Sequence, residues 1–176
     1  PKCGATVDVL GNRFGQTNLV ELRKKIAWVS PFMSQFTNTE STGLEMVLSG
    51  FDGTLGLTRK ATAEEVDTAK ALMERFRCAH LIDQEIFTMS SGEQVKIMIA
   101  RALLNDPQVL LADEPTGNLD PVTADGIMQL FQKIASQGCA VVMSTHNTAL
   151  IENYPARAVL FSKGKIREVD LKAELA

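Results

Sequence analysis

The chain has 176 residues, so it holds at most one domain of ordinary size. Hydrophobic residues make up 45% and charged residues 22%, a balance that excludes a disordered chain. The 18 Lys and Arg stand against 21 Asp and Glu, and no polybasic run offers a track for a nucleic-acid backbone. The longest apolar stretches are also too short to span a bilayer.

Cysteine usage points to a reducing compartment. The 3 Cys are odd in number and lie far apart, so the sequence predicts no disulfide framework and fits the cytosol. With only 2 His in the chain, the same pattern argues against a zinc cage. The chain begins at Pro1 rather than at an initiator Met, which suggests a fragment.

The first part of the chain alternates short strands and short helices. Residues 5–10 alternate in polarity before Gly11 and predict a strand, and residues 26–29 predict a second one. Between them, Asn18 is a plausible cap for a helix over residues 19–25. A further short helix is expected over residues 44–48.

A longer helix begins after Thr62, where Thr62 and Glu65 form a capping box, and is expected to run to about Arg77. The next helix is predicted over residues 90–104. Its apolar residues recur at helical spacing and predict one buried face. They are Val95, Met98, Ile99, Ala102 and Leu103.

The rest of the chain repeats the order strand, helix, strand. Residues 109–112 form an apolar run that predicts a parallel strand covered on both faces. A helix starts at Pro121 under an Asp120 cap, with Ile127, Leu130, Phe131 and Ile134 on its buried side, and it ends at Gly138. The further expected elements are a buried strand at 140–144, a helix at 148–154, and strands at 157–162 and 165–169. This order predicts an α/β fold with a parallel sheet and helices on both of its faces.

Two adjacent carboxylates, Asp113 and Glu114, follow the apolar strand directly. Ligands of open α/β sheets bind at the carboxyl ends of strands. One carboxylate there can hold Mg²⁺ and the next can polarise an attacking water. The alternative is that Asp113-Glu114-Pro115 is only a solvated turn.

Three more segments carry polar groups at similar positions, and each also has a purely structural interpretation. Ser90 and Glu93 form a capping box, yet a helix start that contains Ser and Gly is also an anion site. Asp120 is a helix cap within Gly117-Asn-Leu-Asp120. His146 follows the strand at 140–144 and, taken alone, is a polar surface residue.

Together, and in this order, these segments resemble the ATP-binding cassette (ABC) ATPase family over about residues 4–169. Ser90-Ser-Gly-Glu-Gln94 is similar to the family signature, with Ser91 in place of its usual first Gly. Asp113-Glu-Pro-Thr116 is similar to the Walker B segment, Asn118-Leu-Asp120 to the D-loop, and His146 to the switch histidine.

The resemblance implies a P-loop NTPase-like domain that uses ATP and Mg²⁺. Asp113 would help to hold Mg²⁺, Glu114 would be the general base, and His146 would contact the γ-phosphate. The signature residues would face ATP held by a second ABC ATPase domain in a head-to-tail dimer. The residues concerned are Ser90, Ser91, Gly92, Glu93 and Gln94, with Asp120 beside them.

The phosphate-binding loop of the family, G-x-x-x-x-G-K-[ST], is absent from the chain. Only Gly164-Lys165 joins Gly to Lys, and Ile follows it. We therefore expect a partial domain over residues 1–176 that neither binds ATP tightly nor hydrolyses it alone. The strand before the missing loop lies between the His146 strand and the strand at 157–162 in the family. Its loss predicts a gap in the sheet and unpaired edges.

Another departure concerns the Q-loop glutamine, which in the family contacts the cofactor and its metal. Pro31 follows Val29-Ser30 where Gln is usual, so Gln35 becomes the candidate. Residues 32–88 would form a helical subdomain that touches the membrane partner, and residues 89–169 the core with the signature, Walker B, D-loop and switch His.

Three functions fit this resemblance. The leading one is the ATPase subunit of a membrane transporter, bound to permease subunits on the cytoplasmic face of the cell membrane. The alternative is a degenerate module that does not hydrolyse ATP and lends its signature to a complete partner. A DNA-repair ATPase is disfavoured, because only about 55 residues separate Gln35 from Ser90 and leave no room for a long coiled coil.

Overall fold

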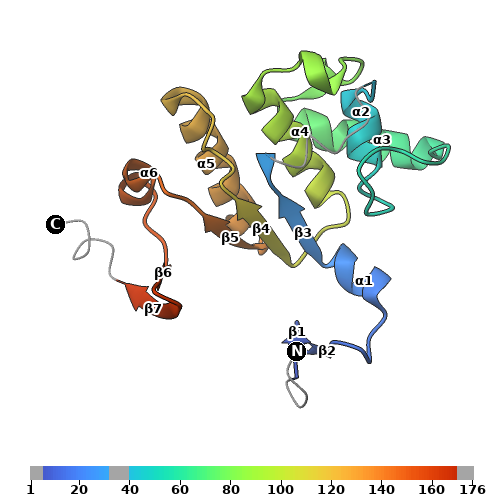
Figure 1. Cartoon of the computed structure of the whole chain (residues 1–176). Helices are drawn as coiled ribbons and strands as arrows, with labels where there is room; N and C mark the ends of the chain where they lie inside the picture. The colour runs from blue at the N-terminus through green and yellow to red at the C-terminus, as the bar shows by residue number, and fades with distance from the viewer. Residues whose placement is uncertain (1–5, 32–39, 170–176) are drawn as a thin grey trace.

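A computed structural model of the chain describes residues 6–31 and 40–169. Its centre is a parallel sheet in the order β3 (Ile26–Val29), β4 (Val109–Asp113) and β5 (Ala140–Ser144) (Figure 1). The three strands occupy the segments where the sequence predicts apolar strands. The α/β fold with a parallel sheet is therefore confirmed.

The register of the sheet separates a covered face from an open one. Trp28 pairs with Leu111, and Leu111 pairs with Val142. Because side chains alternate along a strand, these three lie on one face, and they are 52%, 39% and 57% exposed. Leu110 and Ala112, on the other face of β4, are buried.

Two predictions about cover are therefore wrong for the described residues. The run at 109–112 is covered on one face, and β5 is largely exposed instead of buried. A continuous apolar run is typical of a strand covered on both faces, but here Leu111 lies on the open face of the sheet and is 39% exposed.

The covered face of the sheet packs against α4 (Ser91–Leu103) and α5 (Pro121–Ser136). On α5, Ile127, Phe131 and Ile134 are buried as predicted, and Leu130 is half-buried. The left-handed Gly138 follows the end of this helix.

On α4 the buried surface is wider than the predicted stripe. It adds Ile97, Ala100 and Arg101, whereas Ala102 and Leu103 are only half-buried. The reason is that α2 (Gly43–Leu48) and α3 (Ala63–Arg75) also pack against α4. A helix between a sheet and other helices is buried nearly all round.

The helical region between β3 and α4 consists of α2, α3 and two 3-10 turns, η2 (Ala79–Leu81) and η3 (Ile86–Thr88). Thr62 and Glu65 form the predicted capping box of α3, which ends at Arg75. A second box, formed by Thr42 and Glu45, starts α2 and was not predicted. Domain boundaries at residues 32–88 and 89–169 stay a prediction.

Two antiparallel hairpins lie outside the central sheet. The first pairs β1 (Asp8–Val9) with β2 (Asn12–Arg13) and is followed by α1 (Leu19–Lys24). The second pairs β6 (Ala158–Ser162) with β7 (Lys165–Val169) and follows α6 (Thr148–Asn153).

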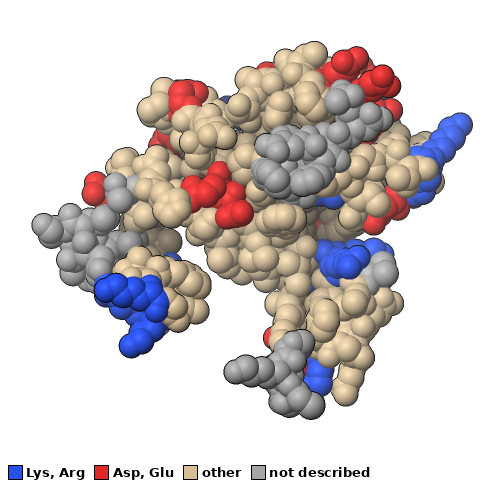
Figure 2. Space-filling view, viewed as in Figure 1, with Lys and Arg blue, Asp and Glu red and all other residues tan. Residues whose placement is uncertain are grey.

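In the described ranges, β6 does not pair with β5, which agrees with the predicted gap in the sheet. Figure 2 shows the two hairpins as lobes below the central body, with open space between them and basic atoms in separate patches. None of the helices in the described ranges combines the length and the hydrophobicity that a bilayer span requires.

Candidate functional site

The carboxyl ends of β4 and β5 bring the predicted catalytic segments together. Asp113 and Ser144 are the last residues of their strands and pair in register. The Ser144 hydroxyl donates to Asp113 Oδ1 at 2.7 Å. The Glu114 N–H donates to Ser144 twice, to the backbone O at 3.2 Å and to Oγ at 3.1 Å. Hydrogen bonds to one serine therefore connect the ends of β4 and β5.

Glu114 has a left-handed backbone, with φ of +46°. For a residue with a side chain, this conformation costs on the order of 1 kcal/mol and persists only where neighbouring bonds hold it. Here Ser144 holds the N–H of Glu114, and the Gly117 N–H donates to its carbonyl at 3.2 Å. The left-handed turn directs the chain from the strand into the loop before α5.

His146 lies next to Glu114, as the resemblance implies. Its Nε2 is 3.5 Å from Glu114 Oε1, the Glu114 side chain is 36% exposed, and the imidazole is 98% exposed. A half-exposed carboxylate can accept a proton from a water molecule, and an exposed imidazole can contact an arriving anion. The structure thus brings Asp113, Glu114 and His146, the residues that the resemblance implies for catalysis and phosphate contact, to one edge of the sheet.

Asp120 acts as the helix cap that the sequence predicts. Its carboxylate accepts from the N–H groups of Val122 at 3.1 Å and Thr123 at 3.0 Å. Hydrogen bonds from Thr123, and then from Val122, hold the pKa of Asp120 below its ordinary value. The Asp120 carboxylate is bound to the start of α5. If it also contacts a nucleotide, it does so while it keeps these capping bonds.

Ser90 caps α4 through the predicted box with Glu93. Glu93 Oε2 accepts from the Ser90 N–H at 2.9 Å and from Ser90 Oγ at 2.7 Å. His80 Nε2 lies 3.5 Å from the other carboxylate oxygen of Glu93. The bonds from Ser90, with a smaller contribution from His80, lower the pKa of Glu93. The Ser90 hydroxyl is thus already oriented at the start of the helix.

The other signature residues bring neighbouring segments close. A Cβ on Gly92 would lie 2.4 Å from Thr123 Cγ2, so a larger residue would require the Thr123 side chain or α4 to shift where α4 meets the start of α5. The Gln94 amide donates to the carbonyls of Ile86 at 3.1 Å and Met89 at 3.2 Å, and thereby holds η3 against α4. Both residues have a structural role that their place in the motif did not predict.

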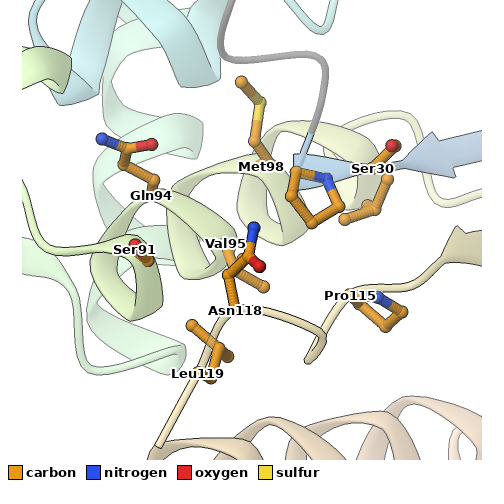
Figure 3. A pocket seen from close by; sticks show the side chains of 10 residues that line it. Ser30, Ser91, Gln94, Val95, Met98, Pro115, Asn118 and Leu119 are labelled. Atoms are coloured by element: carbon orange, nitrogen blue, oxygen red, sulfur yellow. The ribbon is translucent and has the colours of Figure 1, made fainter. Parts of the chain in front are cut away.

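A cavity of about 150 Å³ lies between α4, the end of β3 and the loop after β4. In Figure 3, Ser91 and Gln94 extend from α4, and Asn118 stands between that helix and Pro115. The walls of the cavity therefore include residues of the signature, of the D-loop and of the segment that precedes Gln35. Gln35 itself lies outside the described residues.

The sequence missed three contributors to these clusters, namely Ser144, His80 and the cavity-lining Ser30. Ser144 had a usable signal, because it stands at the same strand end as Asp113. His80 and Ser30 had none, since they reach their partners only through the fold.

The donor set fits Mg²⁺ as a hard cation. Asp113 offers carboxylate oxygens at an exposed edge, and no cluster of three His, Cys, Asp or Glu in the described ranges forms a closed metal cage. Mg²⁺ commonly takes one or two carboxylates together with water and substrate phosphates. The phosphates of ATP need backbone N–H donors in a glycine-rich loop, and the sequence carries no such loop.

Comparison with known proteins also supports the resemblance to the ABC ATPase family. The profile of the ABC transporter family matches residues 2–117. The lipoprotein-releasing system ATP-binding protein LolD of Myxococcus xanthus is 38% identical over 78% of this chain and 59% of its own length. The phosphonates import ATP-binding protein PhnC 1 of Ruegeria sp. is 32% identical over 97% of this chain and 68% of its own length.

Solved structures show the same fold. A nucleotide-free ATP-binding cassette from an ABC transporter superimposes with a TM-score of 0.78 at 20% identity, over 96% of this chain and 72% of that one. The chain spans 55% and 59% of the length of two LolD relatives, from Caulobacter vibrioides and Myxococcus xanthus. By the family profile, its relatives and its fold, the chain belongs to the ABC transporter family and has the fold of the nucleotide-binding domain.

Proposed function

We propose that the chain forms part of the ATP-hydrolysing subunit of an ABC transporter. The observation that carries this proposal is the cluster of Asp113, Glu114 and His146 at the carboxyl edge of β4 and β5. Phosphoryl transfer needs mainly positioning and charge neutralisation, and these side chains offer a metal ligand, a base and an anion contact.

The positions of the residues support the roles that the resemblance implies. Asp113 would supply a carboxylate oxygen to Mg²⁺, which neutralises phosphate charge when bound. Glu114 would accept the proton of the attacking water, and His146, 3.5 Å away, would contact the γ-phosphate. Ser90, held at the start of α4 by Glu93, would reach ATP on a second domain together with Ser91 and Gly92.

The proposal also covers the partners. A second ABC ATPase domain would pair with the chain head to tail, so that the signature of this chain faces ATP held by the partner domain. Permease subunits would place the protein on the inner face of the cell membrane, with contacts from residues 32–88. Because the similar proteins serve different cargoes, lipoprotein release in one and phosphonate import in another, we assign no cargo.

A second candidate is a module that lends its signature to a complete partner and hydrolyses nothing itself. The preformed Ser90–Glu93 cap favours it, because that cap would still serve in trans. The retained Glu114 and His146 favour the first candidate, since a module without hydrolysis needs neither.

The test is MgATP hydrolysis by the protein as its gene encodes it, purified with its membrane partner. We expect Glu114→Gln to lower kcat by about 10² or more, because the general base is lost. Glu152→Gln, on the exposed side of α6, is the matched control and should leave kcat unchanged. Hydrolysis that survives Glu114→Gln would contradict the assignment of the base.

A separate measurement addresses the 176-residue chain. We expect it to show no ATP affinity in the micromolar range, because backbone N–H groups of the phosphate loop are missing. Isothermal titration with MgATP measures this directly. A micromolar dissociation constant would mean that the described residues bind the phosphates in another way.

A further inference from the structure

We propose that Ser144 is a positioning residue that holds both catalytic carboxylates in place. The proposal rests on the hydrolytic function proposed above and adds a residue to its site. Ser144 lies on β5, while Asp113 and Glu114 lie at the end of β4, 31 and 30 positions earlier in the chain.

The Ser144 hydroxyl forms hydrogen bonds with both carboxylate residues. Its one proton goes to Asp113 Oδ1 at 2.7 Å, and its oxygen accepts from the Glu114 N–H at 3.1 Å. A hydroxyl has one donor, so this arrangement fixes the rotation of both Ser144 and Asp113. Asp113 Oδ2 has no hydrogen bond within the described ranges and is the oxygen left to face a cation.

The contact to Glu114 acts on its backbone instead of its carboxylate. Glu114 is in the left-handed region, with φ of +46°, and its N–H is shared between the backbone O and the Oγ of Ser144. An ordinary strand end would offer only the backbone oxygen. The second acceptor favours the conformation that directs the Glu114 side chain toward His146.

Packing does not explain a serine at this position. Ser144 is exposed, and it lies on the same face of β5 as the exposed Val142. A β-branched residue would suit the strand better. Among the described residues, the hydroxyl forms hydrogen bonds only with the two carboxylate residues. His146 follows two positions later, so the same strand end carries all three groups.

The test compares Ser144→Ala with Ser144→Thr, which keeps the hydroxyl, and with Ser162→Ala. Ser162 is the exposed last residue of β6 and is therefore a matched control. In the gene-encoded protein we expect Ser144→Ala to lower the kcat of MgATP hydrolysis about tenfold, with KM for ATP changed less than about twofold. Ser144→Thr should restore most of the kcat, and Ser162→Ala should match the wild type.

Loss of kcat in Ser144→Ala without rescue by Ser144→Thr would indicate a merely structural role and overturn the proposal. An unchanged kcat would overturn it as well. If the wild type hydrolyses no ATP, the proposed function has failed, and the contacts of Ser144 are then tested by NMR of the isotope-labelled chain.

In that NMR experiment, Ser144→Ala should move the Glu114 amide signal and the Asp113 side-chain carboxyl signal. Ser144→Thr and Ser162→Ala should leave both signals in place. The proposal is overturned if the two signals stay unchanged in Ser144→Ala, or if signals move across the whole sheet.

Discussion

The helical region, taken together with α4, and the central sheet contain similar apolar residues but cover them differently. In the helical region, Met46, Met73, Leu81 and Ile99 are completely buried. In the sheet, Trp28, Leu111 and Val142 form a row that is between 39% and 57% exposed. Helices that pack on one another supply their own cover, whereas a sheet needs a layer on each face.

This difference indicates where the stability of the described residues arises. Burial of apolar surface contributes about 25 cal/mol per Å² removed from water, so the helical region gains more from each apolar side chain than the open sheet face does. Exposed apolar rows of this kind are typical of surfaces that another protein segment or a partner covers. The predictions below test the contrast, beginning with the largest effect.

The most direct test makes the same substitution in both regions. Leu81→Ala removes a completely buried side chain and should destabilise the chain by about 2–5 kcal/mol. Leu111→Ala removes a side chain that is 39% exposed and should cost less than about half of that. Urea unfolding of both variants measures the difference, and equal losses would mean that the sheet face is covered in solution.

Glycines provide a second comparison. A Cβ on Gly50 would lie 2.4 Å from the carbonyl oxygen of Arg101, so Gly50→Ala should destabilise the chain by about 1–3 kcal/mol. Gly126, within α5, has no atom within 4 Å of such a Cβ, and Gly126→Ala should stabilise by up to about 1 kcal/mol. The midpoints of thermal unfolding should move in opposite directions, and two shifts of the same sign would refute the close α2–α4 approach.

The N-cap of α5, a helix that packs on the sheet, provides a third test. Asp120→Ala removes the acceptor for the Val122 and Thr123 N–H groups and should cost about 1 kcal/mol. Asp120→Asn keeps an acceptor oxygen and should cost less. Chemical unfolding at neutral pH distinguishes them, and an Asn variant as unstable as the Ala variant would argue against the capping role.

The smallest effect concerns pH in the helical region. Bonds from Arg59, then from Thr62, lower the pKa of Glu65 from an ordinary 4.5 to about 2. Because the folded pKa is depressed, this stabilisation is fully present above pH 4.5 and is lost as the pH falls toward 2. The exposed site keeps the effect small.

This prediction is tested by unfolding the wild type and Glu65→Gln at pH 7 and again near pH 2.5. The wild type should be the more stable at pH 7, and the gap should close in acid. Glu64→Gln, in the same first turn of α3, is the control. A gap that persists unchanged in acid would show that the Arg59 contact does not cause it.

Much of the fold was predictable, because local signals determine helix starts and strand segments. The capping residues Thr62, Ser90 and Asp120 all act as predicted. The open sheet face was not predictable, since periodicity within β4 says nothing about what lies above it. The β1–β2 hairpin was also missed, because the pairing of two-residue strands gives almost no pattern.

The residues of the candidate catalytic cluster could be predicted from the sequence, whereas the hydrogen bonds that support them could not. Asp113, Glu114 and His146 belong to motifs that are contiguous in sequence, and they meet because parallel strands end at one edge. Ser144 lies two residues before His146 at the end of the same strand, but this position alone does not predict its hydrogen bonds. Its contacts depend on the pairing of Asp113 with Ser144, which only the fold provides.

The register between β4 and β5 also determines when the site can form during folding. Asp113 and Ser144 are 31 residues apart, and α5 lies between their strands. Parallel pairs close long loops and therefore form slowly. A slip of one residue would turn Ser144 to the opposite face and separate it from Asp113. We therefore expect the cluster to form late in folding, and we expect a chain with misaligned strands to have folded helices and still lack the site.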